Sequence, residues 1–205
     1  MKQLNNTIGI TGGIGAGKSV VSRVLRCNGF VVYDCDYEAK AIMRNNLGVK
    51  LSLIEKLGND IYSKDGELNR GRLAQMLFSN DNVRTFVNSV VHQAVREDIE
   101  NRRKNIRGDF FIESAIIVTG GIATFCNQIW IVTAPLRERL ERVMKRDKTS
   151  LEAVQKRIDA QQHELSLLDS NKTVMLENDN KTPLLSQILK MTDKLIQQQI
   201  YSISC

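Results

Sequence analysis

The chain has 205 residues, of which 42% are hydrophobic and 25% are charged, and its formal net charge is +6. These proportions are ordinary for a globular protein and exclude a disordered or fibrous chain, and the length suits one core with a small inserted lobe. The longest apolar stretch, Phe110 to Ile129, is interrupted by Glu113 and Gly120-Gly121, so it does not form the run of about 20 apolar residues that a membrane helix needs.

Met1 to Asn6 lacks a basic region followed by an apolar one, so we expect no targeting segment and a cytoplasmic protein. The four cysteines, Cys27, Cys35, Cys126 and Cys205, form no C-x-x-C pair and lie far from both histidines in sequence. Reduced thiols are therefore expected rather than disulfides or a zinc site. The basic residues are spread out and aromatic residues are few, which favours an anionic small substrate over nucleic acid.

A glycine-rich stretch, Gly12 to Ser19, follows a predicted strand over Thr7 to Thr11. It matches G-x-x-x-x-G-K-[ST], the pattern of a loop that binds the phosphates of a nucleoside triphosphate. Its glycines let backbone N–H groups turn inward at the start of a helix predicted over Gly17 to Cys27. Lys18 is expected to contact the outer phosphates and the Ser19 hydroxyl to bind Mg²⁺. We therefore predict Mg-ATP or Mg-GTP as the ligand, contacted by Gly13, Ile14, Gly15, Ala16, Gly17, Lys18, Ser19 and Val20.

A second strand, Phe30 to Tyr33, carries Asp34 and Asp36 at its carboxyl end. In open α/β sheets, ligands bind beyond the carboxyl ends of the strands, so we expect both carboxylates to face the same crevice as the phosphate loop. Asp34 either orders a magnesium-bound water or caps the next helix, and we favour the cap.

Helical periodicity replaces strand signals from Tyr37 to Arg107. Helices are predicted over residues 37–44 and 47–57, from Asn69-Arg70 onward, and from Ser79 to about Lys104. The basic residues 102–104 are typical of a helix C-terminus, and a nucleic-acid role is the less favoured alternative. This helical insert lies where a phosphoryl acceptor would bind.

Strand signals return over Phe110 to Glu113 and over Ile129 to Thr133. Glu113 either orders magnesium-bound water or the acceptor, or caps a neighbouring helix. Trp130 is expected in the core. A last strand over Val174 to Leu176 precedes a helix that begins at Thr182-Pro183, with the proline at its first position.

A cationic helix is predicted over Leu136 to Lys148, with Arg139, Arg142 and Arg146 on one face. Thr149 and Glu152 predict a capping box for a further basic helix. Two such helices suggest a lid that closes arginines over polyphosphate, and the alternative is a solvated charged face. The alternation of strands and helices predicts an α/β fold, a three-layer core with a parallel sheet of about five strands.

Several motifs occur in one order along nearly the whole chain. They are Gly9-Ile10-Thr11-Gly12-Gly13-Ile14-Gly15-Ala16-Gly17-Lys18-Ser19, Asp34-Cys35-Asp36, Asp65-Gly66-Glu67-Leu68-Asn69-Arg70, Val91-His92, Lys145-Arg146-Asp147 with Ser150, and Arg157-Ile158 with Gln161. With these motifs the chain resembles the dephospho-CoA kinase family. It departs from the family at Gln93, where a proline is common, at Ala115-Ile116-Ile117 and Thr119, where P-L-L and an acidic residue are usual, and at Lys172-Thr173, although Asn178 is retained.

The resemblance implies a single P-loop kinase domain over residues 1–205, with a core of about 1–35, 108–135 and 169–205, a helical acceptor-binding insert of about 36–107 and a helical lid of about 136–168. It implies transfer of the γ-phosphoryl group of ATP, bound with Mg²⁺, to the 3′-hydroxyl of the ribose of dephospho-CoA. Asp36 would be the general base, Lys18 would stabilise the phosphates, Arg142 and Arg146 would belong to the lid, and the insert would hold the pantetheine end. We expect His92 to be a packed helix residue and not a catalyst.

Two alternatives remain. One is another nucleotide or small-metabolite P-loop kinase. The other is a nucleotide-dependent switch that transfers no phosphate to a metabolite, which the lack of a guanine-reading N-K-x-D motif disfavours. The expected partners are ATP and dephospho-CoA, with neither nucleic acid nor membrane, and the oligomeric state is left open.

Overall fold

A computed structural model describes residues 6–203 of the chain, with side chains up to residue 197. Its contacts divide it into two compact units, one from the described parts of Met1–Tyr33 and Asn105–Cys205 and the other from Asp34–Lys104. The expectations for Met1 to Asn5 and for Cys205 lie outside the described residues. Within residues 6–203, Cys27, Cys35 and Cys126 take part in no disulfide. No helix among residues 6–203 is long and apolar enough to cross a membrane.

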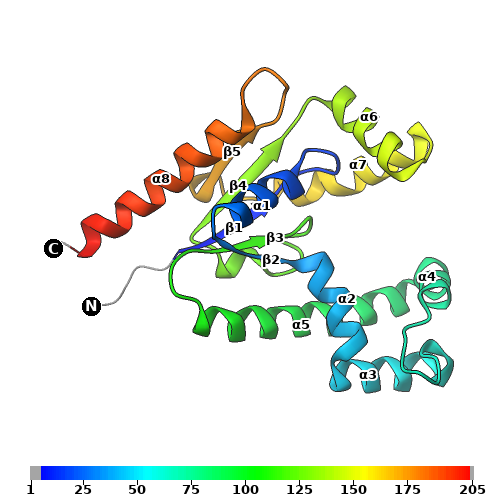
Figure 1. Ribbon diagram of the computed structural model, residues 1–205. Helices are drawn as coiled ribbons and strands as arrows, with labels where there is room; N and C mark the ends of the chain where they lie inside the picture. The colour runs from blue at the N-terminus through cyan, green and yellow to red at the C-terminus, as the bar shows by residue number, and fades with distance from the viewer. Residues whose placement is uncertain (1–5, 204–205) are drawn as a thin grey trace. The chain divides into compact units, whose positions relative to one another are not determined.

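The first unit is built on a five-stranded parallel sheet with the order β2-β3-β1-β4-β5 (Figure 1). The strands are β1 (Thr7–Thr11), β2 (Val31–Asp34), β3 (Phe110–Glu113), β4 (Gln128–Thr133) and β5 (Thr173–Glu177). The central strand is β1, whose Gly9 pairs with Ile112 of β3 and with Ile129 of β4. The predicted α/β fold with a parallel sheet is confirmed.

Two helices, α1 (Lys18–Cys27) and α8 (Leu184–Ile203), pack against a common apolar core of the first unit. Alternation along β1 directs Ile8 and Ile10 into this core, where both are fully buried. Phe111 stacks edge-to-face with Phe30 and with Trp130, at 5.3 Å between ring centroids in each pair. Trp130 is therefore a core residue, as predicted.

The segment from Ser114 to Cys126, which contains the short helix η2 (Ala123–Phe125), packs against β1 at Gly9. A Cβ atom on Gly9 would lie 2.3 Å from Ile117 Cδ1 and 3.0 Å from Cys126 Sγ, so only glycine fits at this position. Burial raises the pKa of the Cys126 thiol to about 12, which keeps it protonated.

The helices α6 (Leu136–Asp147) and α7 (Leu151–Ser166) share a small core of Val143, Val154 and Ile158. The predicted cap of α7 is wrong by one residue. The helix begins at Leu151, so the cap is Ser150, whose hydroxyl accepts from the Ala153 N–H at 3.3 Å. Thr149 therefore lies too early in the chain for its side chain to take that position.

After α7, the short helix η3 (Ser170–Lys172) leads into β5. The start of the final helix also needs a correction. Its first residue is Leu184, and Pro183 comes just before it, with the Pro183 carbonyl accepting from the Gln187 N–H. The Asp179 carboxylate accepts from the N–H groups of Lys181 and Thr182, and these bonds hold its pKa below the usual range.

The second unit is helical, as predicted. Its elements are α2 (Cys35–Asn45), α3 (Leu47–Leu57), η1 (Asn59–Ile61), α4 (Arg70–Ser79) and α5 (Asp81–Asn105). Short polar side chains cap the helices, since Asn46 accepts from the Val49 N–H and Asn69 accepts from the Arg72 N–H. The apolar stripe predicted for α5 is buried at Val87, Val91, Ala94, Val95 and Ile99.

Candidate active site

The glycine-rich loop joins β1 to α1, and glycine is needed at its different positions for different physical reasons. Gly15 and Gly17 have φ angles of 78° and 109°, a left-handed region that side chains rarely adopt. A Cβ on Gly12 would lie 2.2 Å from the Val132 carbonyl oxygen, so the loop passes directly over β4. Glycine is therefore required in this loop both for the backbone conformation and for the close packing against β4.

Every carbonyl from Gly12 to Gly17 accepts a hydrogen bond. The Gly12 carbonyl accepts from Lys18 Nζ (2.7 Å), the Gly13 carbonyl from the Ala16 N–H (3.1 Å) and the Ile14 carbonyl from Arg139 Nε (3.0 Å). The Gly15 carbonyl accepts from Arg142 Nη1 (3.4 Å), the Ala16 carbonyl from Asn178 Nδ2 (2.8 Å) and the Gly17 carbonyl from the N–H groups of Val20 and Val21 (3.0 and 3.3 Å). In a trans peptide the C=O and the next N–H point in opposite directions. Carbonyls held in this way turn the N–H groups that follow them to the opposite side, where such groups form an anion-binding concavity. The N–H groups of Ile14 and Ala16 are themselves bonded, to the Gln161 side chain and to the Gly13 carbonyl.

Lys18, Ser19 and Val20 form the first turn of α1, directly after the loop. The N-terminus of a helix carries partial positive charge and unpaired N–H groups, which favour a phosphate. Lys18 is half-buried, whereas Ser19 and Val20 are exposed. The predicted nucleotide-binding residues thus form one continuous stretch from the loop into the helix.

Side chains from α6 and α7 reach this loop. Besides bonding to Gly15, Arg142 donates to Glu138 at 2.7 Å, to the Asn178 carbonyl and to the Asn180 side chain. Gln161 Oε1 accepts from the Ile14 N–H at 2.6 Å. The structure therefore brings the predicted site residue Arg142 together with the phosphate loop.

Three further residues at the loop were not among the predicted site residues. The sequence places Arg139 only on the same helix face as Arg142, and Gln161 and Asn178 only match a family pattern. That shared face was the available signal for Arg139. Burial lowers the pKa of its guanidinium, which stays charged because arginine side chains are not deprotonated in proteins.

Arg146 makes different contacts from its neighbours on α6. Its guanidinium donates to both oxygens of Asp147, at 2.7 and 3.1 Å, and Arg157 of α7 donates to the same carboxylate at 2.8 Å. The hydrogen bond from Arg146, followed by its charge, holds the pKa of Asp147 below the usual range. In this structure Arg146 therefore serves an ion network that joins α6 to α7.

The two predicted carboxylates after β2 differ in their surroundings. Asp34 is the N-cap of α2, and its Oδ1 accepts from the Tyr37 N–H at 3.0 Å. Asp36 lies in the first turn of α2 with an exposed side chain. The capping role favoured for Asp34 is thus observed, and Asp36 has a carboxylate open to solvent.

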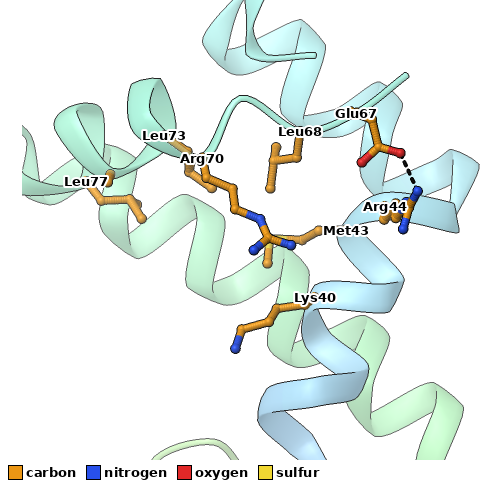
Figure 2. Close-up of a pocket in the computed structure, with 9 residues that line it drawn as sticks. Lys40, Met43, Arg44, Glu67, Leu68, Arg70, Leu73 and Leu77 are labelled. Atoms are coloured by element: carbon orange, nitrogen blue, oxygen red, sulfur yellow. Dashed lines mark hydrogen bonds and ion pairs between the residues drawn. The ribbon is translucent and has the colours of Figure 1, made fainter. Parts of the chain in front are cut away.

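The second unit contains a cavity of about 210 Å³ between α2, α4 and the turn before α4 (Figure 2). Its apolar lining comes from Met43, Leu68, Leu73, Ala74 and Leu77. Lys40, Arg44 and Arg70 add positive charge, and Arg44 is paired with Glu67. Figure 2 shows Arg70 reaching from α4 toward Met43 of α2. Such a lining suits a ligand with both apolar and anionic parts.

Comparison with known proteins gives the family. The family model for dephospho-CoA kinase matches residues 6–183. The chain belongs to the dephospho-CoA kinase family. The dephospho-CoA kinase of Porphyromonas gingivalis is 37% identical over 188 residues, which cover 91% of this chain and 93% of the relative.

Solved structures agree in fold. A crystal structure of a Thermus thermophilus protein has a TM-score of 0.76 and 31% identity, covering 92% of this chain and 96% of that one. The dephospho-CoA kinase of Campylobacter jejuni, at 22% identity and a TM-score of 0.67, covers 93% of this chain and 97% of its own and supports the fold alone.

One departure from the dephospho-CoA kinase pattern has a structural counterpart. Thr119 stands where an acidic residue is usual, and its hydroxyl donates to the Glu164 carboxylate at 2.6 Å. The N–H groups of Val118 and Thr119 donate to the same carboxylate, which is only 4% exposed. A carboxylate from α7 therefore holds the turn that follows β3.

The residues present suit a magnesium ion that enters with a nucleotide. Among the described residues, no three His, Cys, Asp or Glu side chains form a group that could hold a metal ion. Mg²⁺ at phosphate sites takes most of its ligands from phosphate and water, so few protein oxygens are needed. The exposed hydroxyl of Ser19, at the start of α1, is a hard oxygen donor of the required type.

Proposed function

We propose that this chain transfers the γ-phosphoryl group of ATP to the 3′-hydroxyl of the ribose of dephospho-CoA, producing coenzyme A and ADP. The observation that carries the proposal is a phosphate loop with all carbonyls from Gly12 to Gly17 engaged, in a member of the dephospho-CoA kinase family. The reaction would be the last step of CoA synthesis, and the cytoplasm is the proposed compartment. Neither nucleic acid nor a membrane is part of the proposal.

The donor half of the site is proposed to be residues Gly13 to Val20 with Arg142. Loop N–H groups other than those of Ile14 and Ala16, which bond to Gln161 and to the Gly13 carbonyl, would bind the β- and γ-phosphates. Lys18 would stabilise the negative charge that develops on these phosphates. Ser19 would hold Mg²⁺, which neutralises phosphate charge when it is bound. Arg142, already at the loop through its bond to Gly15, adds a cation to the same phosphates.

Asp36 is proposed as the general base. A carboxylate beside the acceptor can accept the proton of the 3′-hydroxyl while the hydroxyl oxygen attacks the γ-phosphorus, and the leaving oxygen stays on ADP. The exposed carboxylate of Asp36 is open to a substrate, whereas the Asp34 carboxylate is engaged in capping α2.

The cavity of the second unit is proposed to receive the pantetheine end of the acceptor, within an insert of about residues 36–107. Its apolar residues would contact the aliphatic part and Arg70 and Lys40 the anionic part. Residues of about 136–168 are proposed as the lid, and the remaining segments as the core. The bonds of Arg142 and Gln161 to the loop support a lid that contacts phosphate. Arg146 would join them once it leaves Asp147.

Turnover by purified protein tests the proposal. With Mg-ATP and dephospho-CoA, we expect CoA and ADP in equal amounts by chromatography. The Asp36→Asn variant should lose on the order of 10² to 10⁴ in kcat, the usual contribution of a general base, and should still bind Mg-ADP. The matched control is Asp34→Asn, because asparagine oxygen also accepts the capping N–H bond and turnover should persist.

Different outcomes separate the alternatives. Loss of turnover in Asp34→Asn but not in Asp36→Asn would exchange the roles of the two carboxylates. ADP release with another acceptor and none with dephospho-CoA would indicate a different small-metabolite kinase. Slow hydrolysis that no acceptor accelerates would favour a nucleotide-dependent switch.

A further inference from the structure

The peptide groups at Ile14 are held by side chains that come from far along the chain. Arg139 Nε donates to the Ile14 carbonyl at 3.0 Å, across 125 residues of sequence. Gln161 Oε1 accepts from the Ile14 N–H at 2.6 Å, across 147 residues. The middle of the phosphate loop is therefore attached to α6 and α7 as well as to β1 and α1.

Gly13 shows how closely Arg139 packs on the loop. Gly13 has no positive φ angle, so its backbone would accept a side chain. A Cβ atom there would nevertheless lie 2.2 Å from Arg139 Nη2 and 2.6 Å from Arg139 Cζ, and one on Gly15 would lie 2.7 Å from the Arg139 carbonyl oxygen. The guanidinium therefore occupies the space that a side chain at position 13 would need.

We infer that Arg139 is a positioning residue of the phosphate loop, which holds the Ile14 carbonyl outward and thereby directs the Gly15 N–H toward the phosphates. Because the peptide is planar and trans, fixing this carbonyl fixes the orientation of that N–H. An inward carbonyl would repel phosphate oxygens, whereas an inward N–H donates a strong hydrogen bond to them. A loop held in this state before nucleotide binds loses less conformational freedom on binding.

The inference rests on the proposed nucleotide site, and it distinguishes Arg139 from a cation that simply attracts phosphate. Two variants separate the hydrogen bond from the charge. Arg139→Gln places an amide nitrogen as many bonds from the backbone as Nε, so a donor remains while the charge is lost. Arg139→Met has a similar length and provides neither a donor nor a charge. The control is Arg137→Met, which removes an arginine of the same helix that is 89% exposed and paired with Glu141.

Calorimetric titration with Mg-ADP and steady-state kinetics with ATP and dephospho-CoA test the inference. Arg139→Met should weaken Mg-ADP binding and raise the KM for ATP about fivefold, as expected for the loss of one intramolecular hydrogen bond. Its kcat should change by less than about twofold, because the bond is made before and during the reaction alike. Arg139→Gln should stay within about twofold of the wild type on each measure, and Arg137→Met should match the wild type.

Several outcomes would overturn the inference. Equal losses in Arg139→Gln and Arg139→Met would show that the charge matters and not the donor, and wild-type affinity in Arg139→Met would exclude any role. A fall in kcat without a rise in KM would place Arg139 in the transition state instead. A wild-type chain that binds Mg-ADP but makes no CoA would contradict the proposed function and leave this test intact.

Gly13→Ala provides a second test that leaves Arg139 in place. In the wild-type background the new methyl group must displace the guanidinium, so Mg-ADP binding should weaken. In the Arg139→Gln background the shorter side chain has no Nη2 atom to displace, and the same change should weaken binding less. Equal losses in both backgrounds would mean that the methyl group meets something other than Arg139, and the inference would fail.

Discussion

Glycine residues of the phosphate loop illustrate how one residue type meets different demands. Gly15 and Gly17 supply left-handed backbone conformations, whereas Gly13 leaves space for a guanidinium that belongs to α6. The local pattern predicts the first demand, because it is a property of the chain itself. The second depends on a neighbour more than 100 residues away, and the sequence alone does not show that Arg139 packs against Gly13.

His92 is a half-buried residue of α5 whose burial, aided by the charge of Arg96, lowers the pKa below 6.5. As the pH falls below 6.5, the unfolded chain binds a proton at this residue before the folded chain does. Stability should therefore decrease with falling pH, from 6.5 down to the folded pKa. At higher pH the residue is neutral in both states and contributes no pH dependence.

Urea unfolding at pH 7.5 and at pH 5.5 measures this effect. We expect the wild type to lose more unfolding free energy between these pH values than His92→Gln, because glutamine does not titrate and all other groups are common to both proteins. Equal losses would show that the imidazole has the same pKa in both states. Near-normal turnover in His92→Gln would agree with a packed helix residue.

At the scale of secondary structure, two polar side chains about one turn apart attach α7 to the rest of the first unit. Gln161 bonds to the phosphate loop and Glu164 bonds to the turn after β3. Periodicity predicts the helix from its own residues, but nothing in the sequence distinguishes Glu164 from the other charged residues of this basic helix. Its burial results from the turn it meets, which lies 45 residues earlier in the chain.

Glu164→Gln should destabilise the protein, because an amide group presents N–H donors to the donors of Val118 and Thr119. Leaving one of these buried groups unpaired costs about 1–3 kcal/mol of unfolding free energy. Urea denaturation of the variant measures the loss. The control is Glu152→Gln at an exposed position of the same helix, for which we expect a change below about 0.5 kcal/mol. Equal effects would contradict a special role for the buried carboxylate.

For the whole molecule, the two units divide the proposed substrates between them. The proposed nucleotide site is formed by residues of the first unit, and the cavity proposed for the acceptor lies entirely in the second. Each ligand should therefore protect a separate part of the chain when it is added alone.

Hydrogen exchange followed by mass spectrometry tests this division. Mg-ADP should slow exchange in residues 12–20 and in the parts of α6 and α7 that bond to the loop. Dephospho-CoA alone should slow exchange around the cavity, in residues 40–44 and 67–77. Protection of residues 12–20 by dephospho-CoA alone would contradict the proposed division, and Mg-AMP, which lacks the outer phosphates, serves as the control for specific nucleotide binding.

The sequence by itself determined the strands, most helices, the phosphate loop and the family, because alternation, helical periodicity and the spacing of Gly12, Gly17, Lys18 and Ser19 are local properties of the chain. Errors at this level were small, with Ser150 instead of Thr149 as a cap and Pro183 just before its helix.

Only the tertiary structure decided which side chains surround the loop. The sheet order places β4 next to β1 and β5 next to β4, so α6 follows the strand beside the loop, and Asn178 follows the next strand. Arg139, Gln161 and Asn178 meet the loop across 125, 147 and 162 residues. Periodicity states which face of a helix is apolar or charged, but strand order determines what that face meets.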